Sequence, residues 1–296
     1  MAEIQPIHVM AGALCDGQGR VLIAQRPAGK HLAGGWEFPG GKLDADEDRL
    51  AGLRRELAEE LGVELVSARP LIKVRHDYPD RSVLLDVWLV DAFTGEPRGL
   101  DGQALVWVPV DELPSHDLLP ADRPIVTALR LPPLAAAAAS REEIERLARG
   151  PACAILWRCR SAEDALEARA LVREVQASGH RVFIVGRGLE AVMAAEAADA
   201  AGTLVAAVDF TPTAGRLAGA FTASGEAALR AAKAGADFIV IAPACGPLSA
   251  PALESLCAYA NVPLYSAWHA GTANLAAAWQ LGAQGLALGP FTAQAH

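Results

Sequence analysis

The pattern of apolar residues changes at Pro132-Pro133, and this change limits the folds that the chain can adopt. After the two prolines, short apolar segments alternate with stretches rich in Ala, Leu, Glu and Arg. Strands that alternate with helices over short connections are typical of parallel β/α units. About eight such units predict an α/β domain of the (β/α)8, TIM-barrel-like class, while an incomplete barrel or an open doubly wound sheet stays an alternative. The expected strands are 134–138, 152–157, 182–185, 204–208, 217–221, 238–241, 264–267 and 285–288, and the expected helices are 141–149, 161–178, 188–201, 225–235, 249–260 and 272–281.

The residues before the prolines follow another pattern, in which several strands surround one helix. Asp16-Gly17-Gln18-Gly19 is a hairpin turn signal between two apolar runs. Strands that do not alternate regularly with helices indicate the α+β class. We therefore expect two domains in the 296 residues, 1–131 and 132–296. Strands are expected at 7–14, 21–25, 71–76, 82–91 and 106–110, with a closing helix at 123–131.

The segment GKLDADEDRLAGLRRELAEELGV, residues 41–63, carries the strongest functional signal. Glu56, Glu59 and Glu60 are spaced i, i+3 and i+4, which gathers their carboxylates on one face of a helix. Leucines that repeat every four residues form the apolar face of the same helix, and Gly62 ends it. Clustered hard oxygen ligands suit Mg²⁺ or Mn²⁺.

This segment resembles the Nudix box, G-x5-E-x7-R-E-U-x-E-E-x-G-U, in which U is an aliphatic residue. GGWEFPGGK (34–42), HDYPDR (76–81) and LLPADRPIV (118–126) are similar to segments of MutT-type Nudix hydrolases, which clear oxidised guanine nucleotides such as 8-oxo-dGTP. The similarity extends over about residues 7–130. Every defined position of the box is filled, by Gly41, Glu47, Arg55, Glu56, Leu57, Glu59, Glu60, Gly62 and Val63.

The resemblance implies a metal-dependent hydrolase that releases nucleoside monophosphate and pyrophosphate. It assigns three acids and one backbone carbonyl as ligands of Mg²⁺ (or Mn²⁺), because the glycine pair lets a carbonyl approach a ligand closely. It also implies an ion pair that orients the loop and the helix. The implied metal ligands are Glu56, Glu59, Glu60 and Gly40, the implied ion pair is Glu47 with Arg55, and the implied substrate-binding residues are Arg26, Phe38 and Asp122.

Two positions depart from the family pattern. Val106 precedes Trp107 where these hydrolases commonly carry a further glutamate, and Asp101 lies on the preceding loop. Asp122 replaces the asparagine that recognises the base. An asparagine amide donates and accepts hydrogen bonds, whereas an ionised aspartate only accepts them. The two departures therefore leave the preference for 8-oxoguanine open.

The second half resembles thiamine phosphate synthase and the related TenI-like barrels in the segments 235–243, 261–268 and 282–291. The residues that this family uses to grip phosphate are largely replaced. The glycine pair after the seventh strand corresponds to Trp268-His269, the fifth-strand serine to Phe221, and the threonine–lysine segment is absent from 242–247. We expect that this barrel has lost the synthase activity and serves packing, homodimer formation or an unidentified ligand.

The composition limits the classes of partner and the cellular location that we expect for the protein. The net charge of −9 disfavours binding to nucleic-acid polymers, so we expect a small-molecule nucleotide as the partner. Five cysteines without a CxxC pair indicate reduced thiols in the cytoplasm. We also expect no signal peptide and no membrane partner, because the first residues lack a basic region before an apolar run and no uncharged span is long enough.

Two alternatives to the nucleoside triphosphate hydrolase follow from the same residues. The box indicates diphosphate chemistry and not the leaving group, so a Nudix hydrolase of a dinucleotide or a nucleotide sugar fits as well. Val106 motivates a second alternative, a nucleotide-binding regulatory protein without catalytic activity. The intact set of three glutamates speaks against the second alternative.

Overall fold

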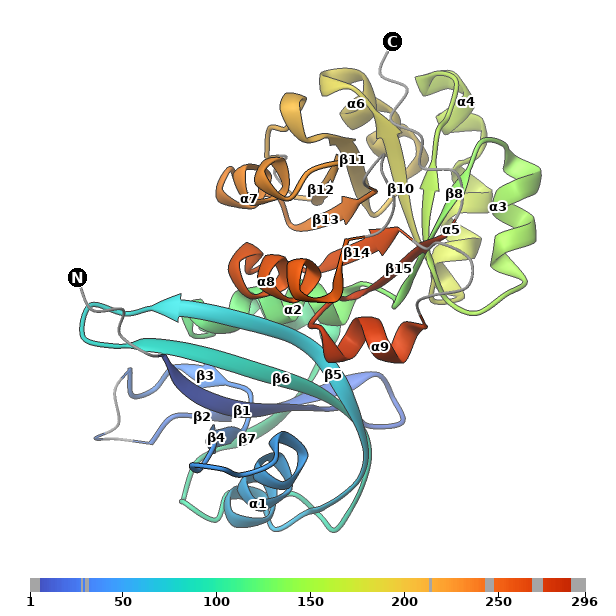
Figure 1. Cartoon of the computed structure of the whole chain (residues 1–296). Coiled ribbons are helices and arrows are strands. Elements are labelled where there is room, and N and C mark those ends of the chain that lie inside the picture. The colour runs from blue at the N-terminus through green and yellow to red at the C-terminus, as the bar shows by residue number, and fades with distance from the viewer. Residues whose placement is uncertain are drawn as a thin grey trace. The chain divides into compact units, whose positions relative to one another are not determined.

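The computed structural model describes residues 6–27, 29, 32–212, 215–242, 248–267 and 274–288. The chain divides into two compact units, residues 1–130 and 131–296 (Figure 1). None of the described helices is long and apolar enough to cross a membrane.

The first unit contains two β-sheets and is of the expected α+β class. Strands β4, β1, β6 and β5 form a sheet in that order, in which β1 and β6 run parallel and the other neighbours antiparallel. A second sheet has the order β3-β2-β7. The elements are β1 (Ile7–Leu14), β2 (Arg20–Gln25), β3 (Trp36–Glu37), β4 (Gly40–Lys42), α1 (Arg49–Leu61), β5 (Glu64–Asp77), β6 (Ser82–Thr94), β7 (Leu105–Pro109), the 3-10 helices η1 (Val110–Ser115) and η2 (Pro120–Asp122), and α2 (Arg123–Arg130).

Helix α1 forms as its sequence pattern predicts. The Asp48 side chain caps its N-terminus by accepting hydrogen bonds from the backbone N–H groups of residues 50 and 51. Gly62 ends the helix in the left-handed region, with φ of 69°. Leu53, Leu57 and Leu61 are fully buried. The apolar face thus anchors α1 in the core and leaves its acidic face free for function.

The short strand β4 depends on glycine. Gly40 has φ of 146°, and a Cβ atom there would lie 2.1 Å from the carbonyl oxygen of Met10. A Cβ atom at Gly41 would lie 2.2 Å from a carboxylate oxygen of Glu56. The glycine pair therefore lets β4 pass tightly between β1 and the acids of α1. The sequence pattern did not reveal β3 or β4, and it placed the start of β5 seven residues late.

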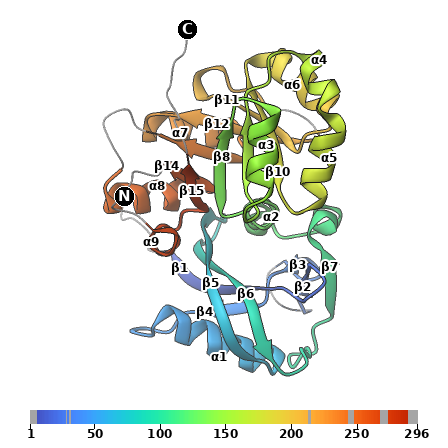
Figure 2. The same ribbon diagram turned by 90° about the vertical axis from the view of Figure 1, so that its right-hand side faces the viewer.

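The second unit is a closed barrel of parallel strands in the order β8 to β15, which confirms the TIM-barrel-like class and removes the alternative of an open sheet. Figure 2 shows helices outside the strands. The expected helix 161–178 is divided at Ala168. The elements are β8 (Leu134–Ala138), α3 (Arg141–Ala148), β9 (Ala154–Trp157), α4 (Ala162–Glu167), α5 (Arg169–Ala177), β10 (Arg181–Gly186), α6 (Gly188–Ala198), β11 (Gly202–Ala206), η3 (Ala207–Asp209), β12 (Leu217–Thr222), α7 (Gly225–Lys233), β13 (Phe238–Ile241), α8 (Ala250–Ala260), β14 (Leu264–Ala267), α9 (Leu275–Gln280) and β15 (Gly285–Leu288).

Large side chains fill the barrel interior. Phe183, Phe238 and Tyr265 are fully buried in one apolar cluster. The Tyr265 hydroxyl donates to the carbonyl of Pro132 at 2.5 Å, and the Gln284 amide donates to the carbonyl of Leu131 at 2.7 Å. These bonds tie the first residues of the unit to β14 and to the start of β15. Because large side chains fill its interior, the barrel is a packed core and not a pore.

Candidate functional site

The first unit contains a cavity of about 510 Å³ that gathers most of the predicted site residues. Apolar side chains of β1 and β6, among them Val9, Ala11 and Leu85, form one wall. Acidic residues of α1 line another part of it, and aromatic and buried polar residues line a further part. The predicted residues on its lining are Arg26, Phe38, Gly40, Glu56, Glu59, Glu60 and Asp122.

The three carboxylates of α1 are held by different partners. Glu60 accepts a hydrogen bond from the backbone N–H of Gly40 at 3.0 Å. Glu56 accepts from the Arg55 guanidinium at 2.7 Å, and Glu59 from the same group at 3.4 Å. The Glu59 side chain is 61% exposed, whereas that of Glu56 is only 12% exposed. The acids therefore reach the cavity at different depths.

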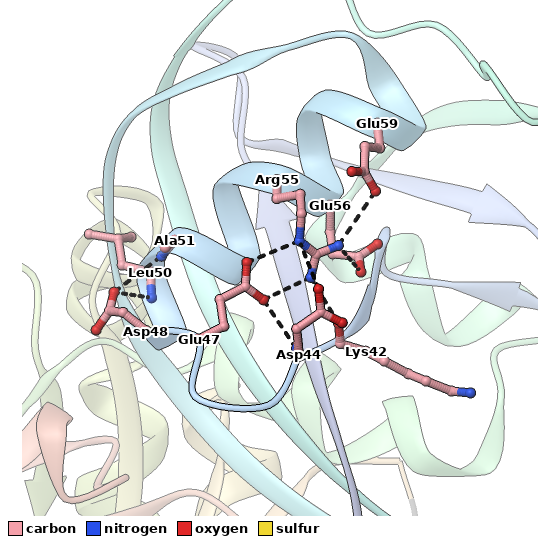
Figure 3. Close-up of polar contacts among 9 residues, drawn as sticks. All are labelled: Lys42, Asp44, Glu47, Asp48, Leu50, Ala51, Arg55, Glu56 and Glu59. Atoms are coloured by element: carbon pink, nitrogen blue, oxygen red, sulfur yellow. Dashed lines mark hydrogen bonds and ion pairs between the residues drawn. The ribbon is translucent and has the colours of Figure 1, made fainter.

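Arg55 joins the box helix to the loop that precedes it (Figure 3). Its guanidinium forms two hydrogen bonds with Glu47, at 3.0 and 2.8 Å, and a third with the carbonyl of Lys42 at 3.0 Å. The hydrogen bonds from Arg55 hold the pKa of the Glu47 carboxyl below its ordinary value. Glu47 also accepts from the backbone N–H of Asp44 at 3.1 Å. The expected ion pair is present, and its geometry fixes the loop on the helix.

The donor set of the cavity fits a hard divalent cation, although the acids do not converge on one point. Among the described residues, no group of three His, Cys, Asp or Glu side chains is arranged as a metal site. Arg55 instead draws two of the three glutamates toward its guanidinium. Carboxylate and carbonyl oxygens are the ligands that Mg²⁺ and Mn²⁺ prefer.

A fourth carboxylate, that of Asp101, also lines the cavity. Its loop is fastened to the C-terminal end of α1, because the N–H of Leu100 and the side-chain amide of Gln103 both donate to the carbonyl of Glu60, at 3.0 and 3.1 Å. Gln103 in turn accepts from the N–H of Asp101 at 2.8 Å. The sequence pattern located Asp101 on a loop without assigning it to the site.

Val106 is not on the lining of this cavity. It lies in β7 opposite Ile23 and packs against the core of the first unit. The position at which the family pattern has a glutamate is thus partly buried and apolar in this chain. Asp101, five residues earlier, supplies a carboxylate to the cavity.

Asp122 lies among aromatic and charged residues of the cavity. It is only 4% exposed. Burial and the nearby negative charge of Glu37 raise the pKa of Asp122 well above its ordinary value, against the opposing effect of Arg26. A neutral carboxyl group at this position is both a donor and an acceptor.

Arg26 forms an ion pair with Glu37, and its Nε is buried without a hydrogen-bond partner among the described residues. Phe38 is 4% exposed, belongs to the apolar core and also lines the cavity. Glu37 and Tyr78 line the cavity as well and were missed as single residues. Their signal in the sequence was membership of the segments GGWEFPGGK and HDYPDR.

Comparison with known proteins identifies the first unit. The family model described as NUDIX domain matches residues 10–128. An 8-oxo-dGTP diphosphatase of Proteus vulgaris is 43% identical over 96 residues, which are 32% of this chain and 86% of that protein. The chain belongs to the Nudix family. Its first unit is a MutT-like Nudix hydrolase domain.

Two further comparisons describe the range of similar Nudix proteins. A CTP pyrophosphohydrolase of Escherichia coli K12 is 39% identical over 122 residues, 41% of this chain and 90% of that protein. The crystal structure of a MutT Nudix hydrolase from Burkholderia pseudomallei matches with 36% identity and a TM-score of 0.38, over 42% of this chain and 96% of the other. The names of the Proteus vulgaris and Escherichia coli relatives thus give different nucleotides, 8-oxo-dGTP and CTP.

Proposed function

We propose that the first unit hydrolyses a nucleoside triphosphate to a nucleoside monophosphate and pyrophosphate, with Mg²⁺ or Mn²⁺ as cofactor. The observation that carries the proposal is that one cavity is lined by the three glutamates of the Nudix box (the box acids) together with Gly40, Asp101 and Asp122. A bound cation would neutralise phosphate charge and orient the triphosphate. The ligands for it would be Glu56, Glu59, Glu60 and the carbonyl of Gly40.

The remaining residues would position the reacting groups. Arg55 and Glu47 fix the loop and the helix relative to each other, and the N–H of Gly40 donates to Glu60 of that helix. Asp101 would accept the proton of the attacking water, because its carboxylate lines the cavity together with the box acids. Arg26 would contact the substrate, and Phe38 would pack against the base.

For the substrate, we propose oxidised guanine nucleotides first, as the clearance of 8-oxo-dGTP to 8-oxo-dGMP and pyrophosphate. The support is the similarity to relatives named 8-oxo-dGTP diphosphatase. The neutral form of Asp122 would replace the usual asparagine, because it donates to guanine O6 and accepts from N1–H. The ionised form would accept from N1–H and the 2-amino group instead.

A cytosine nucleotide is the second candidate substrate. The name of the CTP pyrophosphohydrolase relative and the chemistry of Asp122 both favour it. A neutral carboxyl group pairs with the cytosine edge by donating to N3 and accepting from the 4-amino group, whereas an ionised one cannot donate. Only the guanine edge therefore has a partner in both protonation states of Asp122.

Competition between 8-oxo-dGTP and dCTP across a range of pH tests this proposal. The ratio of kcat/KM for dCTP to that for 8-oxo-dGTP should fall as the pH rises through the pKa of Asp122, because the cytosine edge then loses its donor. In Asp122→Asn the ratio should be independent of pH, since the amide does not titrate. A ratio with the same pH dependence in both proteins would remove Asp122 from the base pocket.

For the second unit, we propose a degenerate relative of thiamine phosphate synthase. The support is the closed parallel barrel together with the similarity in sequence segments. Trp268-His269 and most of 242–247 lie outside the described residues. Phe221 lines a cavity of the barrel where the family has a serine, and an aromatic ring offers no hydrogen bond to a phosphate.

A further inference from the structure

Helix α6 of the second unit is apolar on its outward face as well as on its inward face. Buried alanines of the inward face pack on the barrel core. Leu189 and Met193, one turn apart on the opposite face, are 72% and 53% exposed. Val192 and Ala197, both half-buried, complete this outward face. A helix that is apolar all round is ordinarily buried on both sides, so the outward face of α6 calls for a further contact.

A hollow of about 350 Å³ lies beside this face, between α6 and α4. The two helices pack against each other, as both views show (Figures 1 and 2). Met193 and Ala194 line the hollow from α6, Ala162 lines it from α4, and Ile184 lines it from β10. An aliphatic side chain that enters the hollow would lose contact with water and gain contact with these apolar groups.

The two ends of α6 carry opposite charges. Arg187, which is exposed, directly precedes the helix, and no side chain caps the first N–H groups, whose partial charges are positive. Glu196, which is also exposed, lies in the last turn. When two copies of such a helix lie antiparallel, the positive start of each meets the negative end of the other.

This pairing of charges also fixes which apolar groups meet. With Arg187 of one copy opposite Glu196 of the other, an antiparallel register sets Leu189 opposite Ala194, beside the hollow. Glu190, on the lining of the same hollow, then lies opposite Met193 and meets no like charge of the second copy. The exposed leucine and the hollow thus belong to one self-complementary surface.

We propose that the protein forms a homodimer in which α6 packs antiparallel on α6 of a second copy, across a two-fold axis. Leu189 of each copy enters the hollow between α4 and α6 of the other, and Arg187 pairs with Glu196 at both ends of the contact. A symmetric contact of this kind closes on itself, so it yields a dimer and not a filament. The dimer uses the second unit alone and is independent of nucleotide hydrolysis.

Sedimentation velocity of the full chain over a wide range of protein concentration tests the proposal. The wild type should sediment with twice the mass of one chain and should dissociate on dilution. Leu189→Glu should raise the dissociation constant of the dimer at least about tenfold, because it places a charge in the apolar centre of the contact. Val66→Glu is the matched control, since it replaces an exposed aliphatic residue of β5 in the first unit by the same acid, and it should dimerise as the wild type does.

Charge reversals test the antiparallel register without touching apolar groups. At low ionic strength, Arg187→Glu and Glu196→Arg should each weaken the dimer, because each brings like charges together at both ends of the contact. The double variant should dimerise more tightly than either single variant, since it restores opposite charges in exchanged positions. The proposal is overturned if the wild type is a monomer throughout, if Leu189→Glu dimerises like Val66→Glu, or if the double variant is no tighter than the single ones.

Discussion

Four carboxylates of the Nudix cavity are held in place by different neighbours. Glu56 and Glu59 lie beside the guanidinium of Arg55, and Glu60 is fixed by the N–H of Gly40. Asp101 comes from a separate loop that is fastened to the end of the same helix. Glu56 and Glu59 thus share one guanidinium, whereas a backbone N–H positions Glu60 and hydrogen bonds of the loop position Asp101.

Substitution of Asp101 tests the role of the fourth carboxylate. Asp101→Asn should lower kcat about 10²–10⁴-fold, the range for loss of a general base, while KM changes little. Steady-state kinetics with Mg²⁺ and a nucleoside triphosphate measures both constants. Glu96→Gln is the control, since Glu96 is exposed and outside the cavity lining. A variant of Asp101 with nearly wild-type kcat would assign the proton transfer to another residue.

The position of Asp101 in the cavity could not be predicted from the sequence, whereas that of the box acids could. The spacing of Glu56, Glu59 and Glu60 predicted that they share one face of a helix, because a helix converts local spacing into position. The place of Asp101 depends instead on hydrogen bonds between Leu100, Gln103 and the carbonyl of Glu60, about forty residues earlier in the chain. A contact of this kind leaves no periodic pattern. The high pKa of Asp122 likewise arises from tertiary burial.

At the scale of elements, the start of α1 is joined to β6 by a buried network around Asp86. The Arg49 guanidinium donates to both carboxylate oxygens, at 2.6 and 2.8 Å, and the Trp88 indole donates at 3.0 Å. Nε2 of His8 lies 3.3 Å from the same group. Burial alone would raise the pKa of Asp86, but the hydrogen bonds from His8 and Arg49 outweigh it and lower this pKa. The network fixes the box helix on the sheet.

Asp86→Asn should therefore destabilise the first unit in a pH-dependent way. At neutral pH we expect a loss of about 3 kcal/mol, the lower end for breaking a buried ion pair, because Arg49 is partly exposed. A lowered folded-state pKa gives stability that is fully present above the unfolded value of about 4 and is lost as the pH falls through the folded-state pKa. The difference between variant and wild type should shrink accordingly below pH 4.

Hydrogen exchange of the core amides of β1 and β6 measures this free energy in the first unit alone. Asp91→Asn, which removes an exposed carboxylate from the same strand, is the control and should change stability little. If the stability lost in Asp86→Asn stays constant down to pH 3, then the shape of the Asp86 side chain stabilises the unit and its charge does not.

Elements with a clear period were predicted well, and short ones were not. The four-residue repeat of Leu53, Leu57 and Leu61 predicted α1, and the alternation of apolar and helical segments predicted the barrel. Strands β3 and β4 have two and three residues, too few for any period, and β4 exists because Gly40 tolerates contact with the carbonyl of Met10. The break at Ala168 has no glycine or proline to signal it.

The chain joins a Nudix hydrolase unit to a closed barrel of parallel strands, and we propose that this barrel has kept the packing of the thiamine phosphate synthase fold and lost its activity. The layered interior around Phe183, Phe238 and Tyr265 explains why the barrel pattern survives in the sequence. Thiamine phosphate synthesis requires several anion contacts, and Phe221 in the mouth supplies none. Homodimer formation and the absence of a nucleic-acid partner remain predictions from the sequence.

The full chain should accordingly fail to restore growth of a strain that lacks thiamine phosphate synthase. The same strain carrying an authentic synthase is the positive control, and immunoblotting establishes that the chain is present at a comparable level. Growth without added thiamine would contradict the account of the barrel and would require a different set of phosphate ligands at its mouth.

Phosphorus-31 NMR of the reaction products tests whether Glu56, Glu59 and Glu60 support metal-dependent cleavage of a nucleoside triphosphate. With Mg²⁺ and 8-oxo-dGTP or dCTP, the full chain should yield pyrophosphate and the nucleoside monophosphate, and excess chelator should abolish the reaction. Glu59→Gln should lower kcat by orders of magnitude, because it removes an exposed carboxylate from the cavity, while Glu64→Gln, an exposed acid outside it, should not. Orthophosphate as the sole phosphorus product, or a full rate in chelator, would contradict the claim.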